Sequence, residues 1–159
     1  MASWIGWSVG ALALVGLIGV LVVRSAEHDP EVWHVDPAET TRTGKPNDAL
    51  AAPVGATRAE PDIVLGTTTK PPTALLAALD AAVRAEPRVE VIAGSIEAHR
   101  ITYVQHSAIV GFPDYISVSA VETATGNGLV LWSRSRYGYS DLGVNRARLE
   151  RWLAAAKLL

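Results

Sequence analysis

An uncharged stretch of 20 residues near the start of the chain, from Trp4 to Val23, constrains the fold more than any other feature. It reads WIGWSVGALALVGLIGVLVV and contains a single hydroxyl group, that of Ser8. A helix rising about 1.5 Å per residue would extend roughly 30 Å over this run, which matches the hydrocarbon core of a bilayer. Trp7 lies near one end, where indole rings favour the membrane interface, and Arg24 ends the run at the other. The run therefore predicts one transmembrane anchor over residues 4–23.

A cleaved signal peptide and a buried helix of a soluble protein are the two other interpretations of this run. A signal peptide usually begins with basic residues and ends in small residues before the cleavage site. Here the chain begins Met-Ala-Ser without Lys or Arg, and Arg24 lies two residues before Ala26. An uncleaved anchor fits these features better.

Two minor features bear on how such an anchor would be arranged. Arg24 alone would favour a cytoplasmic domain by the positive-inside rule, whereas a short N-terminal anchor followed by a linker is a common arrangement in exported proteins. We expect a single-pass membrane protein whose domain is extracytoplasmic. Gly6 and Gly10 form one G-x-x-x-G motif, which lets membrane helices approach closely and makes a homodimer an alternative.

The segment after the anchor has a different composition. Residues 25–62 hold eight acidic side chains against Arg42, Lys45 and Arg58, with five prolines spread among them. Proline lacks the backbone donor that helices and sheets need, and no apolar period persists here. We expect residues 24–60 to form an acidic, proline-rich linker. The alternative is that part of it, such as residues 46–53, packs against the domain.

Residues 61–159 carry the periodic patterns of a compact α+β domain. Apolar residues recur at helical spacing from Pro72 to about Glu86 and from about Asp141 or Leu142 to Leu158, which predicts two amphipathic helices. Alternating apolar and polar residues predict strands over 63–65, 88–97, 100–110, 115–123 and 129–137. The order β-α-β-β-β-β-α favours an antiparallel sheet of about five strands with the two helices on one face.

Composition excludes several classes of protein. The 159 residues carry a net charge of −2, so no strongly basic nucleic-acid surface is expected. The chain has no Cys, which excludes disulfides, iron–sulfur clusters and thiol nucleophiles. Four scattered His residues do not have the spacing of a zinc site, and no phosphate-binding glycine loop occurs. We expect neither a metal nor another cofactor.

The most informative segment is SRSRYGYSDLGVNRAR, residues 133–148, where the last strand leads into the last helix. Arg134 and Arg136 are two residues apart on the strand, so they share one face about 7 Å apart. Ser140 or Asp141 can cap the following helix by accepting from its free N–H groups. Arg146 falls on the apolar stripe of that helix, and we expect it to point inward.

An inward arginine needs an acceptor, and this requirement leaves two interpretations open. In a structural network, Asp114 and Asp141 would pair with the arginines and hold the fold together. In an anion site, two or three guanidinium groups beside a helix N-terminus would bind a phosphate or carboxylate. The candidate ligand-binding residues are Asp114, Arg134, Arg136, Ser140, Asp141, Asn145 and Arg146.

The segment resembles the late motif of the domain of unknown function 1499 family of bacteria and plastid-bearing organisms, a string like R-S-x-S-R-x-G-x-S-D-x-G-x-N-R-x-R. Phe112 and Asp114 fit the family's F-x-D step, and residues 45–47 resemble its proline–asparagine motif, whereas His106 stands where an Arg is expected. The likeness covers residues 45–155 and implies no established activity. The string matches at Ser133, Arg134, Ser135, Arg136, Gly138, Ser140, Asp141, Gly143, Asn145, Arg146 and Arg148.

These features predict a membrane-anchored domain that binds an anionic small molecule, a lipid headgroup or a protein partner. One alternative is a hydrolase or transferase acting on an anionic substrate, with the arginines holding it and Asp114 or Asp141 as acid or base. The other is a purely structural envelope protein in which the arginines only stabilise the fold.

Overall fold

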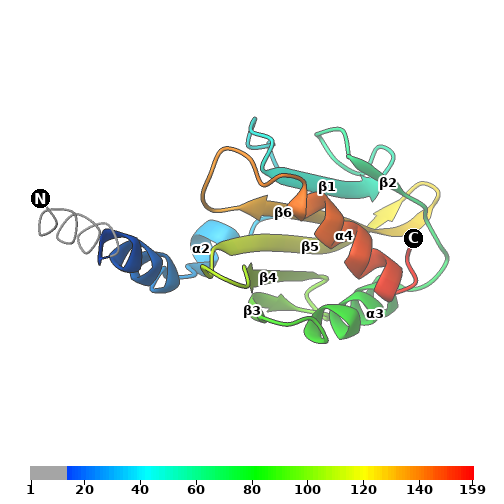
Figure 1. The fold of residues 1–159 in the computed structure, drawn as a ribbon. Helices are drawn as coiled ribbons and strands as arrows, with labels where there is room; N and C mark the ends of the chain where they lie inside the picture. Colours follow the sequence, from blue (N-terminus) through cyan, green and yellow to red (C-terminus); the bar gives the residue numbers. More distant parts are fainter. Residues whose placement is uncertain (1–13) are drawn as a thin grey trace, which may run out of the picture.

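The computed structural model describes residues 14–159 (Figure 1). Six strands form one open sheet in the order β2-β1-β6-β5-β4-β3, which is antiparallel except for the parallel pair β1–β2. The strands are β1 Asp48–Pro53, β2 Ile63–Leu65, β3 Val89–Ser95, β4 Arg100–His106, β5 Pro113–Thr123 and β6 Gly126–Ser135, and the helices are α2 Pro30–Trp33, α3 Pro72–Arg84 and α4 Val144–Ala155.

Helices α3 and α4 cover one face of the sheet and bury the main core (Figure 1). Period-two alternation sends Leu129 and Leu131 of β6 to this face, together with Ile116 and Val118 of β5. The apolar stripe of α3 and the residues Leu149, Trp152 and Leu153 of α4 pack against them. The predicted α+β fold, with both helices on one face, is confirmed.

The opposite face of the sheet is covered by the N-terminal segment rather than by a long helix. Leu50, Ala52, Val130 and Trp132 form a second, smaller apolar cluster there, against which residues 35 and 38 pack. The short helix α2 lies over the same face, and the carboxylate of Asp29 accepts from the backbone N–H of Glu31 at its start. This face is therefore covered by residues that precede β1 in the sequence.

The expected linker over residues 24–60 contributes to this fold. Strand β1 lies between β2 and β6, so the sheet has six strands rather than about five, and residues 46–53 pack as the alternative interpretation proposed. Its sequence, DALAAP, lacks the β-branched and aromatic residues that mark strands. Ala49 and Ala51 are buried in the main core, where β1 contacts α4.

The N-terminal part of the described chain is helical over residues 14–24 and leaves the molecule beside α2 (Figure 1). Among residues 14–159, no helix has both the length and the apolarity needed to cross a membrane. Residues 4–13 of the predicted anchor lie outside the described residues, as do Gly6 and Gly10.

Candidate functional site

Strand β6 divides the arginine-rich string between the two faces of the sheet. Ser133 and Ser135 point toward the helices, whereas Arg134 and Arg136 point to the opposite face, where they meet Tyr115 and Ser117 of β5. We call the surface formed by Trp132, Arg134, Arg136, Tyr115 and Ser117 the arginine face. The expectation that Arg134 and Arg136 share one face of the strand is confirmed.

Arg134 is buried, with 4% of its surface exposed, and lies between two indole rings. Its guanidinium carbon is 4.0 Å from the ring centroid of Trp132 and 5.3 Å from that of Trp33. Nη2 donates to the carbonyl oxygen of Trp33 at 2.9 Å, and Nη1 donates to Ser117 Oγ at 3.2 Å. Both acceptors are neutral.

No carboxylate forms an ion pair with Arg134 within residues 14–159. Loss of hydration on burial lowers the pKa of Arg134 to about 10, although the charges of Asp48 and Tyr115 act in the opposite direction. A buried guanidinium whose hydrogen bonds reach only neutral acceptors is an unusual and costly arrangement.

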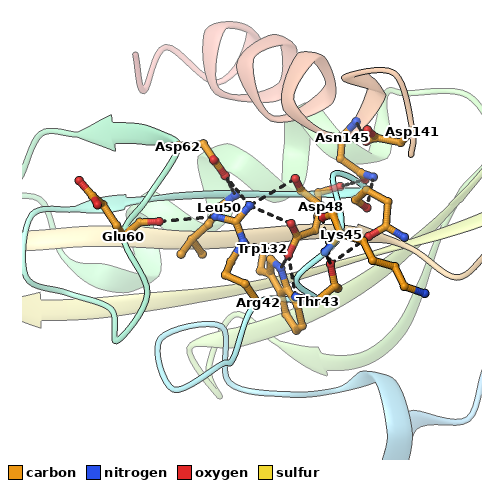
Figure 2. Close-up of polar contacts among 12 residues, drawn as sticks. Arg42, Thr43, Lys45, Asp48, Leu50, Glu60, Asp62, Trp132, Asp141 and Asn145 are labelled. Carbon is orange, nitrogen blue, oxygen red and sulfur yellow. Dashed lines mark hydrogen bonds and ion pairs between the residues drawn. The ribbon is translucent and has the colours of Figure 1, made fainter. Parts of the chain in front are cut away.

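Asp48, the acid nearest in register to Arg134, is already occupied (Figure 2). Arg42 forms two bonds to its carboxylate, at 2.8 and 2.9 Å, and the indole N–H of Trp132 donates to it at 2.9 Å. Burial raises the pKa of Asp48, but the bonds from Arg42 and Trp132 outweigh it and hold the pKa below its usual value. Arg42 also pairs with Asp62 at 3.0 Å, so this cluster ties the segment before β1 to β2.

Arg136 is half-buried at the rim of the arginine face. Its Nη1 donates to the carbonyl oxygen of Glu27 at 2.7 Å and to the hydroxyl of Tyr115 at 3.0 Å. The Tyr115 hydroxyl also bonds His28 Nδ1 at 2.9 Å, and the His28 ring lies 5.2 Å from that of His106. Burial, followed by the charge of His106, lowers the pKa of His28. Cationic and neutral donors therefore gather at this rim.

Residues 27–36 lie over the arginine face, and we call them the N-terminal cover. Several separate contacts hold this cover in place. The Trp33 ring stacks on that of Tyr115 with centroids 3.6 Å apart and an interplanar angle of 7°. His34 Nδ1 bonds Thr102 Oγ1 at 2.9 Å, and Asp36 forms an ion pair with Arg100. Burial, followed by the charge of Arg100, lowers the pKa of His34. Sequence reasoning missed Trp33, since nothing periodic marks the segment that contains it. It placed Tyr115 in a strand but did not assign it to the site.

The helix-covered face holds a separate polar cluster, the Arg148 network, formed by Arg148, Asp114, Gln105, Ser133 and Asn145. Arg148 is buried and pairs with Asp114 at 2.6 Å. It also donates to Gln105 Oε1 at 2.7 Å, to Ser133 Oγ at 2.9 Å and to Asn145 Oδ1 at 2.5 Å. A structural network therefore exists, but it is not the predicted one. Asp114 pairs with Arg148, and within residues 14–159 neither Asp114 nor Asp141 forms an ion pair with Arg134, Arg136 or Arg146.

The prediction that Arg146 points inward is wrong. Arg146 is exposed and pairs with Glu150 at 3.0 Å on the outer side of α4. The error comes from the helix start, because α4 begins at Val144 rather than at 141 or 142. Leu142 lies outside the helix with a φ of 55° and does not belong to the buried stripe.

Asp141, Asn145 and Ser140 support the turn into α4. Asp141 accepts from the backbone N–H of Gly143 at 3.0 Å and of Asn145 at 2.7 Å, which satisfies amide groups that a helix start leaves free. Buried Asn145 donates to the carbonyl oxygen of Asn47 at 3.0 Å, and Ser140 Oγ accepts from the backbone of Leu142. Figure 2 shows Asp141 and Asn145 beside the segment that leads into β1. These three residues lie apart from the arginine face.

A cleft lies at the end of the sheet opposite to Arg136. This cleft of about 270 Å³ is lined by apolar residues of β2, β6 and α4 and by Lys70 and Lys157. It includes no residue of the arginine-rich string. Within the described part of the chain, no three side chains of metal-ligating type converge.

Comparison with known proteins gives a family and a distant structural likeness. The model of the family described as "Protein of unknown function (DUF1499)" matches residues 35–156. Among solved structures, the chain is similar to the X-ray crystal structure of protein MLL2253 from Mesorhizobium loti, with 14% identity and a TM-score of 0.44, over 60% of this chain and 93% of that chain. No match was found among curated proteins.

Proposed function

The chain belongs to the DUF1499 family of proteins of unknown function, and we propose that it is a membrane-anchored protein whose domain binds an anionic group on the arginine face. The anchor is the apolar run over residues 4–23, and we expect the domain to be extracytoplasmic. The ligand carries a phosphate or a carboxylate group.

The observation that carries this proposal is the buried charge of Arg134. A buried guanidinium is normally matched by a carboxylate, because desolvation costs several kcal/mol unless an opposite charge offsets it. Arg134 has two neutral acceptors instead, and its neighbour Arg136 has the same kind of partners. An anionic group would provide the missing charge and would suit the paired donors of two guanidinium groups.

The carbonyl oxygens of Glu27 and Trp33 indicate where the ligand oxygens would bind. They accept from Arg136 and Arg134 at 2.7 and 2.9 Å, as two oxygens of a phosphate or carboxylate would. Arg136 is the accessible one, so a ligand would first meet it together with the Tyr115 hydroxyl. Reaching Arg134 would require residues 27–34 to move away from the sheet.

Catalysis is less well supported than binding. Asp114, one of the two candidate acid–base groups, lies on the opposite face of the sheet from Arg134 and is paired with Arg148. Asp141, the other, accepts from backbone amide groups at the start of α4. Neither carboxylate faces a ligand held by Arg134 and Arg136, so the geometry favours binding over a hydrolase or transferase reaction.

Thermal unfolding of the full chain in detergent micelles tests the proposal. Inorganic phosphate, citrate and glycerol 3-phosphate are the probes, and wild type is compared with Arg136→Gln and Arg146→Gln. A ligand at about 100 times its Kd stabilises by about 2.7 kcal/mol, or roughly 5–10 °C for a chain of this size. We expect that increase in wild type and Arg146→Gln, and its loss in Arg136→Gln.

Arg146→Gln is the matched control, because it removes the same charge from the same string at an exposed position. A response to glycerol 3-phosphate that exceeds the response to inorganic phosphate would indicate a lipid headgroup rather than a free anion. If no probe raises the melting temperature of wild type, the arginine face is structural and the proposal is refuted.

A further inference from the structure

Two loops at one end of the sheet carry exposed apolar and aromatic side chains next to the helix over residues 14–24. The loop between β4 and β5 exposes Ile109 by 86% and Phe112 by 42%. The loop between β6 and α4 exposes Tyr137 by 40% and Tyr139 by 71%. We call these four side chains the apolar edge.

The two loops lie at the same end of the sheet and touch each other. Asp114 at the start of β5 pairs in register with Ser135 at the end of β6, so the adjoining loops are neighbours. The Phe112 and Tyr137 rings are 6.0 Å apart. The two loops therefore meet at Phe112 and Tyr137.

The helix over residues 14–24 is attached directly to this surface. Arg24 Nη2 donates to the carbonyl oxygen of Ile109 at 3.1 Å, and its Nε donates to that of Val110 at 3.2 Å. A Cβ atom at Gly111 would lie 3.2 Å from the Arg24 side chain, so the loop fits closely around it. Figure 1 shows the helix leaving the molecule at this end of the sheet.

We propose that the apolar edge inserts into the interface of the bilayer that holds the anchor. The domain then lies against the membrane surface and is not connected to it by a flexible linker alone. This inference rests on the anchor of the proposed function. Arg24 ends the 20-residue apolar run and so lies at the membrane surface. Since Arg24 is bonded to the loop of Ile109, that loop is at the membrane surface too.

The loop between β4 and β5 is built to present its apolar tip. Ser107 Oγ accepts from the backbone N–H groups of Gly111 and Phe112 at 3.1 and 2.9 Å, which closes the loop and leaves Ile109 at its tip. Phe, Tyr and an aliphatic residue are the side chains that membrane interfaces accommodate.

The charges around the apolar edge also suit a lipid surface. Arg24 is bonded to the β4–β5 loop, and Arg88 Nε donates to the carbonyl oxygen of His106 at the start of this loop. The guanidinium carbon of Arg136 lies 5.5 Å from the ring centroid of Tyr137. Basic side chains next to a membrane attract anionic headgroups. Apolar side chains next to arginines fit a bilayer better than a soluble acidic partner.

Single cysteines test this docking in the full chain, which has no native Cys. Ile109→Cys, Tyr139→Cys and the control Val54→Cys are each labelled with an environment-sensitive fluorophore and reconstituted into phosphatidylcholine vesicles, with and without phosphatidylglycerol. Val54 is 80% exposed at the opposite end of the sheet, next to the start of β6. Quenching by lipids spin-labelled near the headgroup reports the depth of each probe.

We expect quenching at positions 109 and 139 to exceed that at 54 by about twofold or more, because an interfacial side chain lies within about 5–10 Å of the headgroup boundary. Ile109→Asp should reduce the quenching at 139, and Val54→Asp should not. A chain that stays in alkali-washed vesicles with equal quenching at 109 and 54 overturns the docking alone. If the alkaline wash releases the chain, the anchor of the proposed function fails and the docking fails with it.

Discussion

Replacing Asp114 by Asn tests whether the Arg148 network stabilises the fold. Asn has nearly the same shape as Asp, so the change removes a charge and little volume. Arg148 then remains buried, with its side chain 6% exposed, and without a carboxylate. Removal of one partner of a buried ion pair costs about 3–5 kcal/mol, since the remaining charge stays desolvated. That is a large part of the 5–15 kcal/mol by which a domain is typically stable.

Arg146→Gln provides the matched control within the same helix. It breaks the ion pair with Glu150, in which the two side chains are 54% and 47% exposed. Exposed pairs of this spacing contribute about 0.3–0.5 kcal/mol. The two variants therefore each remove one charge and one ion pair, but their expected costs differ by roughly tenfold.

Heat unfolding of the full chain in detergent micelles, followed by far-ultraviolet circular dichroism, measures this difference. A loss of 1 kcal/mol lowers the melting temperature by about 2–4 °C at this chain length. Asp114→Asn should therefore lower it by about 10 °C, and Arg146→Gln by less than about 2 °C. Equal melting temperatures for the two variants would refute the argument that the Arg148–Asp114 pair stabilises the fold.

Three further predictions concern the N-terminal cover and the sheet. Burial lowers the pKa values of His28 and His34 from the ordinary 6.5. The unfolded chain therefore binds protons more readily, and the cover should loosen as the pH falls below about 6.5. The double variant His28→Gln, His34→Gln should remove this pH dependence of hydrogen exchange in the cover. Trp33→Ala should speed hydrogen exchange of the cover and lower stability by about 1–3 kcal/mol in thermal unfolding, because it removes the ring that stacks on Tyr115. Gly94→Ala should lower the melting temperature strongly, since its φ is 86° and a Cβ would lie 2.0 Å from a backbone oxygen of β4.

The sequence predicts the elements whose pattern is local. Helix α3 follows from the spacing of Leu75, Leu79 and Val83, and strands β4 to β6 follow from their alternation. Strand β1 does not, because DALAAP has no β-branched or aromatic residues. Its place in the sheet depends on tertiary contacts, with Leu50 on one side and Ala51 on the other.

Within the candidate site, the error over Arg146 and Arg148 shows how much depends on a helix boundary. Counting Leu142 as part of the buried stripe places Arg146 inward. In the structure Leu142 lies in a left-handed turn before α4, and the buried stripe contains Asn145 and Arg148. Periodicity registers apolar residues only, so it cannot identify a helix that buries its polar residues in a network.

The alternation in SRSR, residues 133–136, explains why one segment can serve two purposes. Ser133 and Ser135 point into the helix-covered face, where Asp114 supplies the charge that Arg148 needs. Arg134 and Arg136 point to the other face, where their acceptors are backbone carbonyls and hydroxyls. A fold that needed only stability would gain from a carboxylate there, as it has one across the sheet. The difference between the two faces is therefore the physical reason to look for an anion on the second.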